Sequence, residues 1–116
     1  MQSEDAVFSV SKTSFWTIKT QGRGLLLKAQ DLRNLLILLN FAEEHPSLQF
    51  DAQVRTVNSG FITIRTWDEG QTFVRLAELN ESGEFLGSVT LFRSRLAELV
   101  TAVTRELQNQ KDGHAA

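Results

Sequence analysis

Residues 48–92 alternate between apolar and polar side chains in segments separated by turn sequences, and this pattern constrains the fold more than any other feature of the chain. Successive side chains of a strand point to opposite faces, so alternation with period two is typical of half-buried strands. Asn, Asp and Gly recur between the segments, as they do in tight turns. The sequence therefore predicts an antiparallel meander with strands at 48–57, 61–67, 72–79 and 85–92.

Two further segments have helical periodicity. Residues 94–107 place Leu96, Leu99, Val100, Val103 and Leu107 along one side, which predicts an amphipathic helix that covers the meander. A second helix is expected to start at Asp31 as N-cap and to end before Pro46. This second helix is apolar on most of its circumference, so we expect it to be covered on more than one side.

The first part of the chain predicts strands at 6–11, 14–20 and 25–28, with the last two closing a hairpin across Gln21-Gly22-Arg23-Gly24. The halves 6–45 and 48–107 both read as strands followed by a helix, which suggests a loose internal pseudo-repeat. The predicted class is α+β, an antiparallel sheet with two helices. We expect one domain over residues 1–109 and a disordered tail over 110–116.

Composition restricts the function classes. The formal net charge is −2, so a site for an anionic ligand must be a local cluster of Arg and Lys. The chain has no cysteine, which excludes disulfides and thiolate chemistry. No apolar run is long enough to span a membrane, and the acidic N-terminus lacks the features of a secretory signal. We expect a cytoplasmic protein without a membrane partner.

Aromatic and basic residues share one face of the predicted meander. Phe61, Arg65 and Trp67 alternate with apolar residues on one strand, and Phe73 and Arg75 do so on the next. Rings can stack on unpaired bases while guanidinium groups neutralise phosphates. A second cluster, in the first hairpin, extends this surface. The predicted nucleic-acid-binding residues are Phe61, Arg65, Trp67, Phe73, Arg75, Trp16, Lys19 and Arg23, with Phe15 and Lys28 nearby.

A meander of four strands followed by a helix, with aromatic and basic residues on the strands, resembles the superfamily of the Whirly proteins, the Pur proteins and the single-stranded-DNA-binding transcriptional coactivators. The similar part is residues 61–107, where the segment Phe61–Trp67 and the closing strand Gly87–Leu91 look like strands of the bacterial coactivator-like proteins. The resemblance implies a curved antiparallel sheet that binds single strands and helices that mediate dimer formation. Arg65, Trp67, Phe73 and Arg75 are the residues that match its binding face.

The alternative is a surface covered by protein. Aromatic residues on a sheet are often core or interface residues. The helix over 32–41 has more apolar surface than the interior of a small domain can cover. This interpretation predicts a protein–protein interaction or assembly module, with a homodimer as its simplest form. Both interpretations predict a homo-oligomer.

Catalytic signatures are lacking. The histidines His45 and His114 are far apart and neither accompanies a nucleophile, and no phosphate-binding or dinucleotide-binding motif occurs. Carboxylates gather at turns as Glu78, Glu81 and Glu84, but solvated turn residues explain them better than a metal site does. We therefore predict no enzyme activity, no metal and no cofactor.

Overall fold

The computed structural model describes residues 8–10, 16–69 and 72–115. The described chain contains β1 (Phe8–Val10), β2 (Lys19–Gly22), β3 (Leu25–Leu27), α1 (Ala29–Glu44), β4 (Asp51–Arg55), β5 (Phe61–Asp68), β6 (Thr72–Leu79), β7 (Phe85–Phe92), the short 3-10 helix η1 (Arg93–Arg95) and α2 (Leu96–Ala115). The α+β class is confirmed. Strands β4 to β7 form the expected meander, and β5, β6 and β7 begin at the predicted residues.

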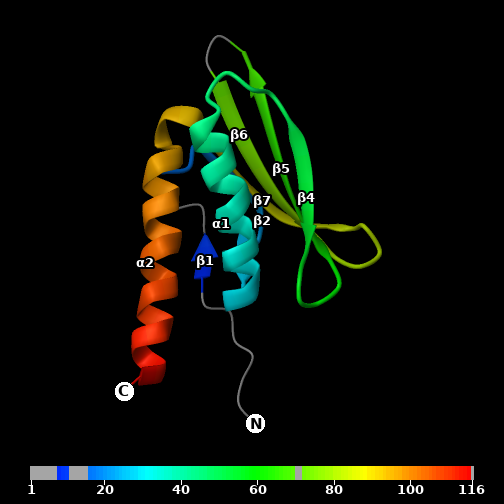
Figure 1. Cartoon of the computed structure of the whole chain (residues 1–116). Coiled ribbons are helices and arrows are strands. Elements are labelled where there is room, and N and C mark those ends of the chain that lie inside the picture. The colour runs from blue at the N-terminus through cyan, green and yellow to red at the C-terminus, as the bar shows by residue number, and fades with distance from the viewer. Residues whose placement is uncertain (1–7, 11–15, 70–71, 116) are drawn as a thin grey trace.

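The architecture has two layers. Five antiparallel strands form one sheet in the order β2-β7-β6-β5-β4, and both helices lie next to each other on one face of it (Figure 1). The inward apolar side chains of β5, β6 and β7 are fully buried because the helices cover this face. The core gathers Ile62, Ile64, Val74, Leu76, Val89 and Leu91 from the sheet and Leu32, Leu35, Leu39, Leu96, Leu99 and Val103 from the helices. Among the described helices, none is long and apolar enough to cross a membrane.

The pairing of the first strands differs from the prediction. β2 does not form a hairpin with β3 but pairs antiparallel with β7, whereas β3 pairs with β1 in a separate two-stranded sheet. The expected strand over 14–20 begins only at Lys19, and residues 14–15 lie outside the described part. The halves 6–45 and 48–107 are therefore joined in one sheet, because β2 from the first half forms its edge.

β3 crosses the inner face of the large sheet at the paired residues Glu78 and Gly87. A Cβ on Gly87 would lie 2.1 Å from the carbonyl oxygen of Gly24, so only glycine permits this close approach of two backbones. Glu78 is buried, accepts a hydrogen bond from the Leu26 N–H (3.2 Å) and forms an ion pair with Arg23 (3.0 Å). The crossing therefore joins the small sheet to the large one by close packing and by a carboxylate.

Both ends of α1 are fixed by the second half of the chain. Asp31 was predicted as N-cap, but α1 already begins at Ala29. The buried Asp31 carboxylate accepts the Lys28 N–H (3.4 Å) and, from the turn after β4, the Val57 N–H (2.9 Å). At the other end, Arg93 donates to the carbonyl oxygens of Ala42 (2.7 Å) and Glu43 (2.8 Å), which satisfies acceptors that the last helical turn leaves open.

The remaining elements follow the prediction with shifted ends. α1 ends at Glu44, two residues before Pro46, as expected. β4 is shorter than the predicted strand, and its exposed and half-buried residues alternate as the sequence indicated. α2 continues to Ala115, well past Leu107, where the helix was expected to end.

We expect Asp31→Ala to lower the free energy of unfolding by about 2 kcal/mol, because two backbone N–H groups lose a charged acceptor in a buried site. Urea denaturation followed by circular dichroism measures this change. Glu81→Ala, at an exposed turn, is the control and should stay within about 0.5 kcal/mol of the parent. Equal effects of the two substitutions would contradict the role given to Asp31.

Candidate nucleic-acid interface

The face of the five-stranded sheet that points away from the helices, here called the outer face, has no described element packed over it. Figure 1 shows the helices on the other face only. On β5, Ile62, Ile64 and Thr66 point inward and are buried, so Phe61, Thr63, Arg65 and Trp67 point outward. The predicted division of β5 into two faces is therefore correct. On β6, the pairing places Phe73 and Arg75 on the same outer face.

Strand register aligns rings into one row across the outer face. Trp67 pairs with Phe73, and Phe73 pairs with Phe92 on β7. The rings of Trp67 and Phe73 are stacked, with centroids 5.4 Å apart and planes at 21°, and those of Phe73 and Phe92 are 5.5 Å apart. These three residues form the aromatic row. The rings lean on one another and are all partly exposed, so they form a continuous apolar ridge.

A second row, directly next to the first, carries positive charge. Register places Arg65 opposite Arg75, Arg75 opposite Thr90, and Thr90 opposite Lys19 at the β2 edge. We call Arg65, Arg75 and Lys19 the cationic row. It lies two residues along the strands from the aromatic row, a distance of about 7 Å.

Within the cationic row, Arg65 and Arg75 have like charges on directly paired positions, an arrangement that costs stability. Asp51 of β4 lies on the other side of Arg65, but the two groups are 3.9 Å apart and exposed by 66% and 72%, so water screens their attraction. Arg75 extends along the sheet to within 5.9 Å of the centre of the Phe85 ring. The Arg65 guanidinium is the more accessible of the two.

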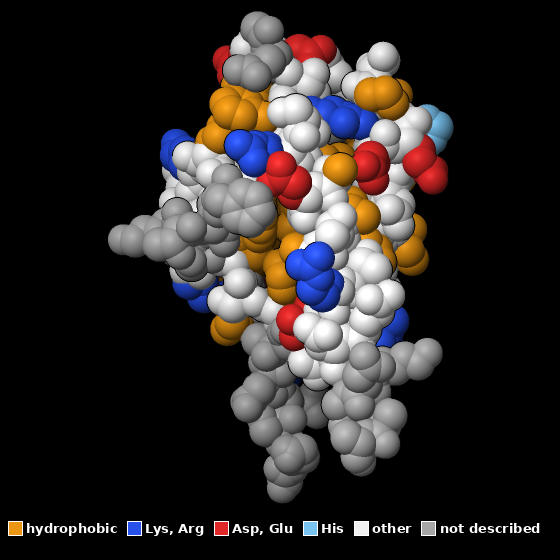
Figure 2. Space-filling view, turned by 90° about the vertical axis from the view of Figure 1, so that its left-hand side faces the viewer, with side chains coloured by type: hydrophobic (Ala, Val, Ile, Leu, Met, Phe, Trp, Pro, Cys, Tyr) orange, Lys and Arg blue, Asp and Glu red, His pale blue; other side chains and the backbone are white. Residues whose placement is uncertain are grey.

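The outer face is positive although the whole chain is slightly negative. Among its described strand residues, Lys19, Arg55, Arg65 and Arg75 outnumber the one carboxylate, Asp51. Acidic groups lie at one end, where Glu69 accepts the indole N–H of Trp67 (3.0 Å). On the side of the molecule where α2 lies, by contrast, Lys and Arg are interspersed with Asp and Glu (Figure 2).

The predicted site residues do not all meet on this surface. Phe61, Arg65, Trp67, Phe73, Arg75 and Lys19 share the outer face. Trp16 is the correction: it is 7% exposed and belongs to the hydrophobic core, so its ring cannot stack on a ligand. Arg23 pairs with Glu78 at the crossing of β3, and its charge is thereby compensated. Phe15 lies outside the described residues.

Sequence reasoning missed Phe92, Phe85 and Arg55. Phe92 completes the aromatic row, and the Arg55 guanidinium lies 5.3 Å from the centre of the Phe61 ring on the same face. Counting residue pairs outward from the turn between β6 and β7 would place Phe92 opposite Phe73 only if the register shift between Glu78 and Leu79 were known. The sequence does not mark this shift.

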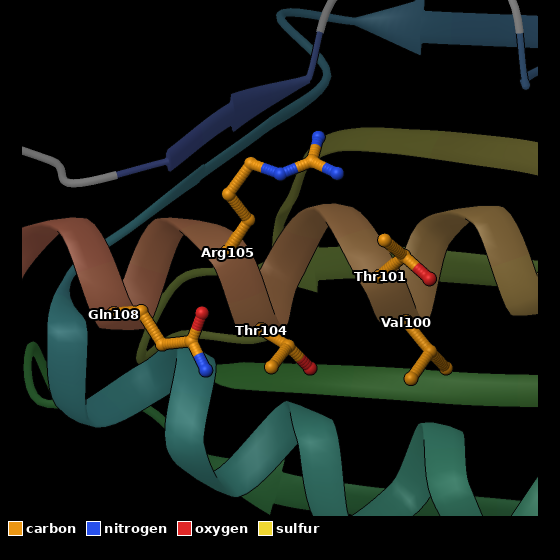
Figure 3. Close-up of a pocket in the computed structure, with 5 residues that line it drawn as sticks. All are labelled: Val100, Thr101, Thr104, Arg105 and Gln108. Carbon is orange, nitrogen blue, oxygen red and sulfur yellow. The ribbon is translucent and has the colours of Figure 1, made fainter.

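Other parts of the described chain offer less. A pocket of about 250 Å³ on α2 is lined by Val100, Thr101, Thr104, Arg105 and Gln108, and Arg105 points away from Thr104 and Gln108 (Figure 3). These side chains include no pair of a nucleophile and a base. Among the described residues, no group of three or more His, Asp or Glu is placed to hold a metal ion. Glu78 and Glu84, considered together as carboxylates of one site, bind different partners, Arg23 and Asn80.

No family model matches the chain, and searches of curated proteins and of solved structures also find no match. The resemblance to the Whirly, Pur and coactivator superfamily therefore stays a prediction that these comparisons do not test.

The two tryptophans differ in burial, which gives a direct check of this geometry. We expect the Trp67→Phe variant, which keeps only Trp16, to emit at shorter wavelength and to resist acrylamide quenching, because Trp16 lies in the core. The Trp16→Phe variant should emit at longer wavelength and be quenched more readily. Steady-state fluorescence with acrylamide titration measures both, and equal quenching of the two folded variants would contradict the placement of the rings.

Proposed function

We propose that this protein is a non-enzymatic, cytoplasmic protein that binds single-stranded nucleic acid on the outer face of its sheet. The observation that carries the proposal is the parallel course of the aromatic row and the cationic row on a face that no described element covers. Bases stack on the exposed parts of the rings, and the phosphates of the same strand lie over Arg65, Arg75 and Lys19. The spacing of the rows is comparable to the distance from a base to its own phosphate.

The paired arginines give a physical reason for an anionic ligand. Arg65 and Arg75 occupy directly paired positions of β5 and β6, an arrangement in which like charges repel. A phosphate between them replaces this repulsion with two attractions and releases counterions. A surface that serves only to keep the protein in solution gains nothing from such an arrangement.

Selectivity for single strands follows from the rings. Bases of a duplex are already stacked on their neighbours, so they cannot reach Trp67, Phe73 or Phe92. Each base that stacks on an aromatic side chain contributes about 1–3 kcal/mol, and every base has a flat face. The proposed binding is therefore tolerant of sequence, with positioning by phosphate contacts and without base-specific hydrogen bonds.

We expect a labelled mixed-sequence single strand to bind with an affinity that falls steeply with salt, and a duplex of the same sequence to bind more weakly. Trp67→Ala should lower the affinity by about fivefold or more, the lower end of what one stacked base contributes. Fluorescence anisotropy at low and moderate salt measures these affinities. Absence of binding at low salt would exclude the proposal and leave a protein partner as the occupant of the outer face.

Arg65→Ala separates function from stability. It should weaken binding, reduce the slope of log affinity against log salt by about one, and leave the free energy of unfolding unchanged or raised by a few tenths of a kcal/mol, because the repulsion from Arg75 is removed. The matched control is Arg105→Ala, at an exposed arginine on α2, which should change none of these three quantities. A loss of stability in Arg65→Ala equal to its loss of binding free energy would contradict the assignment.

A further inference from the structure

Among the described strands, β4 forms a free edge of the large sheet. It is the last strand in the order β2-β7-β6-β5-β4, so no described strand pairs with the edge of β4 that lies away from β5. The Thr66 N–H donates to the Phe50 carbonyl and the Thr56 N–H to the Gly60 carbonyl, so even-numbered residues of this segment use their backbone groups on β5. Asp51, Gln53 and Arg55 consequently direct their backbone N–H and C=O groups away from the sheet.

Free edges are usually protected by proline, bulges or charged side chains, because an exposed row of backbone groups pairs readily with another chain. β4 contains no proline, and its pairing with β5 is regular throughout. Its side chains on the outer face are polar, but Asp51 and Arg55 carry opposite charges and lie two residues before and after Gln53. This symmetry is what a strand needs to pair with its own copy.

We propose that two copies of the chain join their β4 strands antiparallel about a two-fold axis at Gln53, forming one continuous sheet of two subunits. In this register Gln53 meets Gln53 of the partner subunit, and Asp51 of each copy meets Arg55 of the partner subunit. Both charge pairs are attractive and lie on the outer face. The backbone N–H and C=O groups that point away from β5, those of Asp51, Gln53 and Arg55, form roughly six hydrogen bonds between the copies.

The same register covers apolar surface on the inner face. Ala52 and Val54 are only half-buried in the single chain. In the proposed dimer, Ala52 of each copy lies opposite Val54 of the partner subunit. α1 runs beside β4, since Asp31 contacts Val57 after the strand and Phe41 contacts Phe50 before it. Phe41 is 40% exposed and Ile37, one turn earlier, is 68% exposed. The second copy brings its own α1 to the same seam, where these side chains can be buried.

Charge exchange tests the register. Asp51→Arg or Arg55→Asp alone turns both attractive pairs into repulsive ones and should raise the dimer dissociation constant about tenfold or more. The double variant Asp51→Arg/Arg55→Asp restores two attractive pairs and should return the dissociation constant to within a few-fold of the parent. Sedimentation velocity over a concentration series, without nucleic acid, measures these constants, so the outcome is independent of the proposed ligand.

Gln53→Pro supplies a second variant. It removes an N–H that points away from β5, so no bond within the sheet is lost, but it blocks the centre of the seam and should give a monomer that circular dichroism shows to be folded. A monomeric parent at every concentration would overturn the proposal. Single variants that dimerise like the parent, or a double variant as weak as the singles, would do so as well.

A cysteine at the axis gives a readout that does not depend on disrupting the interface. The chain has no cysteine of its own, so Gln53→Cys introduces a single thiol. Residues that face each other in a hydrogen-bonded antiparallel pair have Cα atoms about 5.5 Å apart, within the range of a disulfide. Gln53→Cys should form a covalent dimer on mild oxidation, whereas Arg105→Cys on α2 should stay monomeric on a denaturing gel. Equal cross-linking of both variants would overturn the proposed axis.

Discussion

The structure depends on one constraint: the described part of the chain has two long helices, and both lie on the same face of a five-stranded sheet. Burying the inward side chains of β5, β6 and β7 stabilises the fold, since each large apolar side chain removed from water contributes about 1.5–3 kcal/mol. No described helix remains for the opposite face. The side chains on that face must be compatible with water or be covered by a partner, and the strands carry arginines and aromatic rings in those positions. The candidate site therefore follows from the way in which the core is built.

Contacts between distant parts of the sequence keep this two-layer arrangement in place. α1 belongs to the first half of the chain, but its two ends are fixed by Val57 and Arg93 from the second half. Glu78 does the same for the small sheet through Leu26 and Arg23. Asp31 and Glu78 are buried and Arg93 is half-buried, and a polar group in such a place loses more stability when its partner is removed than one on the surface does. They specify where α1 and β3 lie against the sheet, which apolar packing alone would leave less defined.

Local patterns predicted the part of the fold that local interactions determine. The limits of β6 and β7 and the two faces of β5 could be derived because alternation and turn residues act over a few positions. The partner of β2 could not be derived, since β2 (Lys19–Gly22) is polar and mostly exposed, so its sequence has no apolar pattern that favours β3 or β7 as its neighbour. Trp16 was misplaced for a related reason: a ring next to basic residues looks the same in sequence whether it points to the core or to solvent. Phe92 joined the aromatic row only through the long-range register of β6 and β7.

Asp51 of β4 takes part both in the proposed seam between two copies and in the charge balance of the proposed ligand surface. Asp51 lies next to Arg65 within its own subunit and opposite Arg55 of the partner subunit across the axis, so its charge offsets arginines on both sides. In the single chain Asp51 is mostly exposed, and its attraction to Arg65 is screened. Pairing the β4 strands draws Asp51 toward the seam and leaves the Arg65 and Arg75 repulsion less compensated. In the proposed dimer the cationic rows of two subunits lie on one continuous outer face, and the proposed ligand, a single strand long enough to cross the seam, contacts both rows, which raises its effective concentration at the second row.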